Sequence, residues 1–74
     1  MKYSKVHVQY RDGSKPHGAR VVLGFSAGMT SPGYTDRDGD ATIPHESVGR
    51  AEVYVNGKQV GSFQAPGETV VFVS

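Results

Sequence analysis

The chain has no cysteine and no tryptophan, and it carries neither a block of like charge nor a long apolar run. The lack of cysteine excludes disulfides and thiolate metal sites. Eight Lys and Arg against seven Asp and Glu leave a net charge of +1, without the basic patch that nucleic-acid binding requires. No segment approaches the roughly 20 apolar residues of a membrane-spanning helix, and the N-terminus lacks an apolar signal-peptide core. We therefore expect no nucleic-acid partner and no membrane span.

Turn-forming residues are abundant instead. Ten glycines and four prolines are spread along 74 residues. They recur too often for any apolar pattern with helical spacing to last three turns, so no helix is predicted. A chain of this length forms one domain at most and buries only about 60% of its unfolded surface. The sequence therefore predicts a single domain over residues 1–74.

Apolar and polar residues alternate between the turns, which is typical of half-buried strands. In the first segment Val6, Val8 and Tyr10 share one side, so all three are expected in the core. Seven strands are predicted, at residues 5–10, 19–25, 34–35, 41–43, 50–55, 58–63 and 69–73. Seven short strands with frequent turns indicate an all-β fold, a small antiparallel seven-stranded sandwich.

Three local features refine this expectation. Asn56-Gly57 lies between two strand segments and predicts a type I′ hairpin, because both residues tolerate positive φ. Gly61 indicates a β-bulge, which would let Val60 and Phe63 both face inward. Residues 69–73 are apolar on both faces and are predicted to form a central or covered strand.

Two pieces of the sequence resemble carboxypeptidase regulatory-like domains, which are related in fold to transthyretin. The first piece consists of Asp12-Gly13, Pro16, Gly18-Ala19, Val21 and Leu23, and the second of Thr35-Asp36, Gly39, Ala41 and Ile43. The resemblance implies a transthyretin-like (prealbumin-like), Ig-like sandwich without catalytic activity. It also implies an accessory or spacer domain of an exported protein, and hence an extracellular or periplasmic location.

The stretch T-D-R-D-G-D-A-T-I-P raises the question of a calcium site. Asp36, Asp38 and Asp40 match the first three ligand positions of an EF-hand loop. The glycine of that loop is replaced by Ala41, and its bidentate Glu by Ser47. A turn fits better, with Asp36 bonded to its own backbone and Gly39 at positive φ. We expect no cofactor, with a weak calcium site at the three aspartates as the alternative.

G-F-S-A-G at residues 24–28 matches the nucleophile-elbow pattern around Ser26, but no helix follows it and the chain is too short for that fold. We therefore expect no enzyme. The surrounding small-residue segment predicts a flexible loop, with Ser26, Gly28, Met29 and Tyr34 as candidates for contact with a partner. Tyr34 beside the aspartate turn leaves weak carbohydrate binding as a further alternative.

The three histidines, His7, His17 and His45, have no metal-binding spacing and are expected on the surface. Val22 is expected on the polar face beside Arg20, as part of an apolar patch. Small sandwiches also keep unpaired edge strands that can accept another strand. We therefore expect a non-enzymatic structural or protein-interaction module, whose partner is another protein, a neighbouring domain or a second copy.

Overall fold

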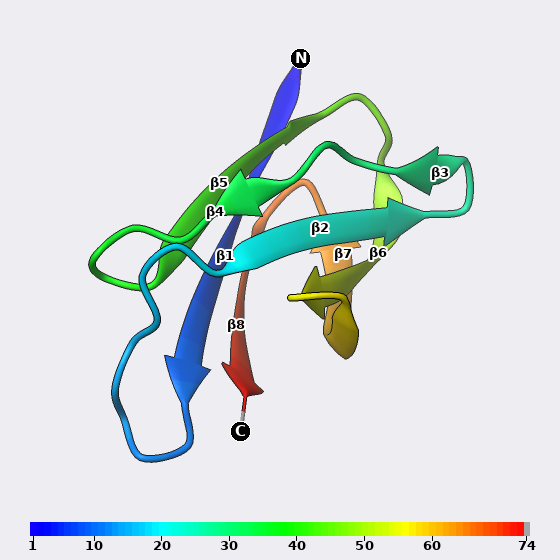
Figure 1. Cartoon of the computed structure of the whole chain (residues 1–74). Helices are drawn as coiled ribbons and strands as arrows, with labels where there is room; N and C mark the ends of the chain where they lie inside the picture. Colours follow the sequence, from blue (N-terminus) through cyan, green and yellow to red (C-terminus); the bar gives the residue numbers. More distant parts are fainter. Residues whose placement is uncertain (74) are drawn as a thin grey trace.

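The computed structural model describes residues 1–73 (Figure 1). It contains eight strands: β1 (Lys2–Tyr10), β2 (Arg20–Phe25), β3 (Gly28–Met29), β4 (Gly33–Tyr34), β5 (Asp40–His45), β6 (Gly49–Val55), β7 (Lys58–Ala65) and β8 (Glu68–Val73). No helix occurs in this part of the chain, which confirms the all-β prediction. The additional strand is β3, which lies within the segment predicted to be a loop.

The strands form two sheets. One has the order β5-β1-β8, and the other has the order β3-β2-β6-β7 with β4 also paired to β2. The prediction of purely antiparallel pairing is wrong for one pair, because β8 runs parallel to β1. After β7 the chain crosses from the second sheet to the first, and β8 arrives there in the direction of β1 (Figure 1). Residue alternation along a strand carries no information about such a crossing.

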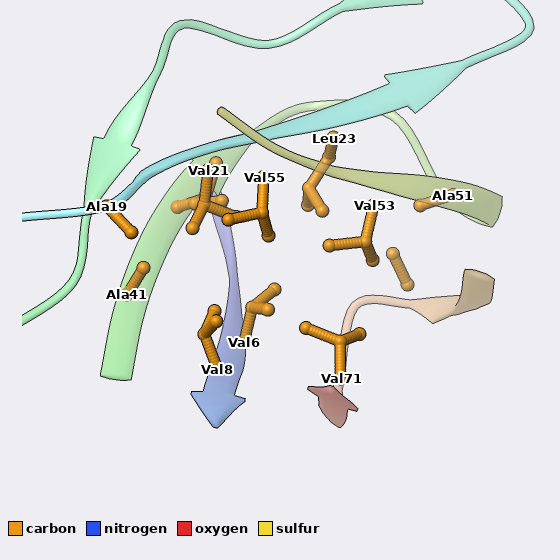
Figure 2. Close-up of a cluster of buried hydrophobic side chains, with 12 residues drawn as sticks. Val6, Val8, Ala19, Val21, Leu23, Ala41, Ala51, Val53, Val55 and Val71 are labelled. Atoms are coloured by element: carbon orange, nitrogen blue, oxygen red, sulfur yellow. The ribbon is translucent and has the colours of Figure 1, made fainter. Parts of the chain in front are cut away.

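The two sheets face each other across one apolar core (Figure 2). β1 contributes Val6 and Val8, β2 contributes Val21 and Leu23, and β6 contributes Val53 among others. The period-2 patterns placed these side chains correctly, and the architecture is sandwich-like. Tyr10 was predicted in the core but is 37% exposed, because it is the last residue of β1 and lies beyond the packed layers.

Val22 and β8 also depart from the predictions. Val22 lies on the outer face of β2 but is only 4% exposed, so it contributes nothing to an exposed apolar patch. β8 is neither central nor covered, because it is an edge strand whose outward side chains Val70 and Phe72 are exposed. An apolar run on both faces of a strand does not require burial on both faces.

The β6–β7 hairpin forms as predicted. Asn56 has φ 53° and Gly57 has φ 86°, as a type I′ turn requires. The pairing of β6 with β7 shifts register so that Val53 faces Gly61 and Tyr54 faces Gln59. Val60 is therefore the extra residue of a bulge beside Gly61, and Val60 and Phe63 both pack against the core.

Hydrogen bonds close one flank of the fold, where β4 meets β5. We call this part of the molecule the closed flank. The buried Thr35 hydroxyl donates to the carbonyl of Pro16 (2.9 Å) and accepts from the N–H of Ala19 (2.9 Å). The Gly39 carbonyl accepts from the N–H of Val8 (2.7 Å). The two bonds of Thr35 join the two sequence pieces that carry the family resemblance.

Candidate functional site

The aspartate turn between β4 and β5 is built as the turn interpretation predicted. One carboxylate oxygen of Asp36 accepts from the N–H of Asp38 (2.8 Å) and of Asp40 (3.1 Å), and Gly39 has φ 80°. The N–H groups of Asp40 and then Asp38 lower the pKa of the Asp36 carboxyl below its usual value. Asp36 therefore serves first as the acceptor that closes this turn.

The third aspartate belongs to a different neighbourhood. Asp40 contacts Nδ1 of His7 through one oxygen (2.7 Å) and Nζ of Lys5 through the other (3.7 Å). His7 is therefore half-buried and paired, not a free surface histidine. Within residues 1–73, no group of three or more His, Asp or Glu side chains is arranged to hold a metal ion. The weak calcium site remains a prediction, and its three carboxylates do not act as one set.

The segment after β2 is tied to the sheet and is not the flexible loop that was predicted. Gly28 and Met29 pair with Phe25 and Gly24 as strand β3. Leu23 donates its N–H to the Thr30 hydroxyl (3.1 Å) and accepts from the Thr30 N–H (2.9 Å). Small residues permit the tight turn between β2 and β3. The prediction of a flexible loop was wrong because a run of small residues is typical both of mobile loops and of short hairpins.

Of the candidate loop residues, Ser26, Gly28 and Met29 are exposed around the β2–β3 turn, and Tyr34 is exposed on β4. Tyr34 pairs with Arg20 in the ladder, so it lies at the other end of β2 from the turn. The four residues therefore do not form one surface.

His45 was predicted on the surface but is only 6% exposed, because it ends β5 with its side chain on the core face. Its Nδ1 donates to the carbonyl of Ser47 (2.8 Å), and its Nε2 accepts from the hydroxyl of Ser4 (2.7 Å). The Ser4 oxygen also accepts from the N–H of Gly67 (3.2 Å). Sequence reasoning missed this network, although Ser4 shares the inward side of β1 with Val6 and Val8.

Among the regions described, the outer edge of β8 most resembles a functional site. The backbone N–H of Lys5 donates to the carbonyl of Gly67 (2.9 Å), and the backbone N–H of Arg11 donates to the carbonyl of Val73 (3.3 Å). Since backbone groups alternate in direction along a parallel ladder, the odd-numbered residues of β8 bond to β1. The N–H and C=O groups of Glu68, Val70 and Phe72 point away from it. No backbone bond joins them to another residue in the described part of the chain.

The same three residues direct their side chains onto the outer face of the sheet. Val70 is 56% exposed and Phe72 is 52% exposed, and Val70 lies next to His7 in register. Unpaired backbone groups thus lie on three alternate residues, and two of these residues, Val70 and Phe72, also expose apolar side chains. We call these residues, Glu68, Val70 and Phe72, the β8 edge.

Every other edge of the two sheets carries a feature that hinders strand addition. β3 and β4 are two residues long, β5 contains Pro44, and β7 begins with Lys58 and has the bulge at Val60. Short strands, proline, lysine and bulges are the means by which proteins protect exposed edges. The β8 edge has none of them apart from the charge of Glu68.

A groove of about 460 Å³ adjoins the end of β8, where the two sheets separate. Its apolar lining comes from Tyr10, Val60, Phe72 and Val73, and Arg11 and Lys58 add positive charge. Phe72 belongs both to this groove and to the β8 edge. A strand added to β8 would therefore have its side chains beside an apolar, positively charged depression.

Comparison of the chain with protein-family models, with curated proteins and with solved structures gave no match. The resemblance to carboxypeptidase regulatory-like domains therefore remains a prediction. Within residues 1–73, no helix is long and apolar enough to cross a membrane.

Proposed function

We propose that this chain is a non-enzymatic protein-interaction module that binds a partner by strand addition at the β8 edge. The observation that carries the proposal is the row of free backbone groups at Glu68, Val70 and Phe72, which coincides at Val70 and Phe72 with exposed apolar side chains. In strand addition, main-chain hydrogen bonds supply affinity and alternate side chains supply specificity. The role agrees with the accessory or spacer function that the family resemblance implies.

The absence of a catalytic role is part of this proposal. The Ser26 of the elbow-like pattern is in a two-residue hairpin turn, whereas His45 is bonded to Ser4 and Ser47. Ser4 is itself 1% exposed, so a substrate would not reach the hydroxyl that His45 contacts. These contacts give the histidine a structural task at the junction of β1, β5 and the β7–β8 turn.

Weak calcium or carbohydrate binding at the aspartate turn is less well supported. One oxygen of Asp36 already accepts two backbone N–H groups, and Asp40 faces His7 and Lys5. Calcium prefers six to eight oxygen ligands, and bringing Asp40 into such a set would cost its present contacts. A calcium titration against chelator, followed at the amides of residues 36–41, tests this alternative.

The proposal is tested by selecting displayed heptapeptides on the immobilised domain, with counter-selection on Val70→Pro. Proline removes the outward N–H of Val70 but leaves the bonds of β8 to β1, which come from the neighbouring residues. We expect enrichment of peptides with alternating apolar residues that bind the natural chain and not the variant. Enriched peptides that bind both proteins equally, or no enrichment, would contradict the proposal.

A further inference from the structure

We propose that the groove at the ends of β1 and β8 binds a small amphipathic anion, an alkyl carboxylate of medium chain length. The alkyl chain lies between the two sheets, and the carboxylate lies at the mouth of the groove beside Arg11 and Lys58. The inference does not depend on strand addition at the β8 edge. It rests on the apolar walls of the groove and on the sign of the charge at its rim.

The groove continues the core beyond its last packed layer. Tyr10 and Val73 are paired in register at the ends of β1 and β8, which lie side by side, and each continues the buried side of its strand (Figure 1). Val55 and Val60 line the groove from the β6–β7 hairpin of the other sheet. Val60 and Val73 are only partly buried, so the side chains of the two sheets line this space without filling it.

The interior of the groove is apolar and of limited size. Besides the valines, it is lined by Ala19, which is 7% exposed, and by the buried Pro16. Its volume of about 460 Å³ lies in the range of small-molecule sites, about 300–1,000 Å³. A multiply charged ligand would lose its hydration there without gaining partners, whereas an alkyl chain gains from leaving water. The interior therefore favours a single apolar chain.

The rim of the groove carries positive charge from both sheets. Arg11 directly follows β1 and Lys58 begins β7, so each sheet contributes one cation. Neither forms an ion pair with another of residues 1–73, and no Asp or Glu of this part of the chain lines the groove. The neighbouring carboxylate of Asp12 accepts from the N–H (2.9 Å) and the hydroxyl (2.7 Å) of Ser14.

The charged groups select the head group of the ligand. A guanidinium presents two parallel N–H groups that match the two oxygens of a carboxylate, and an ammonium adds a second positive charge. An alkyl cation of the same length would meet two like charges at the mouth and find no carboxylate there. The combination of apolar walls with a cationic rim thus specifies an amphipathic anion.

The inference is tested by NMR titration of the labelled chain with sodium decanoate, followed at the valine methyl groups. Decyltrimethylammonium has the same chain with the opposite charge, and octanoate has two methylenes fewer. Arg11→Gln/Lys58→Gln removes the charge of the rim. Lys2→Gln/Arg37→Gln is the matched control, because it removes the same charge from two exposed residues outside the groove. Circular dichroism checks that each protein stays folded in the presence of each ligand.

We expect saturating shifts centred on the methyl groups of Val55, Val60 and Val73, with a dissociation constant of about 0.1–1 mM for decanoate. Octanoate should bind about tenfold more weakly, because two fewer methylenes are buried. Decyltrimethylammonium should bind at least about tenfold more weakly than decanoate, and Arg11→Gln/Lys58→Gln should lose about fivefold to tenfold in decanoate affinity. Lys2→Gln/Arg37→Gln should bind decanoate as the natural chain does.

Three results would each overturn the inference. The first is shifts that do not saturate or that centre on another part of the chain. The second is equal binding of decanoate and decyltrimethylammonium. The third is undiminished decanoate binding by Arg11→Gln/Lys58→Gln.

Discussion

At the closed flank the buried Thr35 hydroxyl bonds to the connection between β1 and β2, and the Gly39 carbonyl bonds to β1. At the opposite flank, which we call the open flank, the edges of β7 and β8 are without strand partners among residues 1–73. β7 is bulged and begins with Lys58, whereas β8 is regular and exposes Val70 and Phe72. The bonds of the closed flank continue the β2–β4 pairing and the β1–β5 pairing, and within the open flank β8 alone is left suited to pairing.

The two flanks differ in their roles: residues of the closed flank contribute to stability, whereas residues of the β8 edge contribute to binding. Substitutions at the closed flank should change the free energy of unfolding. In the molecules that remain folded, they should not affect strand pairing at β8. Substitutions on the β8 edge should do the reverse, since the side chains are exposed and the backbone groups are free.

Gly39→Ala should have the largest effect on stability. Gly39 has φ 80°, and a Cβ there would run into the backbone oxygen of Val8 and the side chain of Lys15. The positive φ alone costs about 1–2 kcal/mol, and the clash with backbone adds to it, so we expect a loss of about 3 kcal/mol or more. Urea unfolding measures the loss.

Gly57→Ala is the matched control, because Gly57 has φ 86° but nothing lies within 4 Å of its added Cβ. It should lose only the conformational term, about 1 kcal/mol. Equal losses for the two variants would show that the contact of Gly39 with β1 contributes nothing.

Thr35→Val should cost about 2–3 kcal/mol at the closed flank. The shape is kept, but the carbonyl of Pro16 loses its donor and the N–H of Ala19 loses its side-chain acceptor. Thr42→Val, on the exposed face of β5, should change the unfolding free energy by less than about 0.5 kcal/mol. Thermal unfolding of the two variants side by side checks the difference.

Giving β8 a protective charge should affect binding far more than stability. In Val70→Lys/Phe72→Lys the added charges stand on exposed positions, so the unfolding free energy should change by less than about 1 kcal/mol. Peptide binding at the β8 edge should be lost. Ser62→Lys/Gln64→Lys on the exposed face of β7 is the control, and it should keep peptide binding.

Acidification should produce the smallest effect, through the turn carboxylates. The pKa of Asp36 is lowered by the N–H groups of Asp40 and Asp38, and that of Asp12 by the side chain and then the N–H of Ser14. A lowered pKa in the folded state adds stability above the unfolded pKa, about 3.9, which is lost as pH falls through the folded value.

Asp36→Asn keeps an acceptor oxygen in the turn but does not titrate. The difference in unfolding free energy between the natural chain and Asp36→Asn should therefore shrink between about pH 5 and pH 2. Asp38→Asn is the control, because Asp38 takes part in the turn through its N–H. A constant difference across this range would contradict the assigned role of the carboxylate.

The elements that follow from local chemistry could be predicted from sequence. Asn56-Gly57 gave the hairpin, Asp36 and Gly39 gave the turn, and alternation placed Val6 and Val53 in the core. Each depends on residues close together in the chain, whose conformational preferences survive folding.

The features that were missed depend on topology. The exposure of β8 and the burial of His45 follow from which strands become neighbours, and alternation within a strand does not specify that. The β8 edge could have been found from the apolar outward residues Val70 and Phe72 only after the sheet order was known. Ser4, on the inward side of β1, was a usable signal for a buried polar partner.

The binding role of the β8 edge is tested most directly by an amide NMR titration of the labelled domain with a peptide selected against Val70→Pro. We expect the amides of Glu68, Val70 and Phe72 to shift and become protected from hydrogen exchange, while those of residues 61–64 on β7 do not. Changes confined to β7 or to the β2–β3 turn would contradict the assignment of binding to the β8 edge.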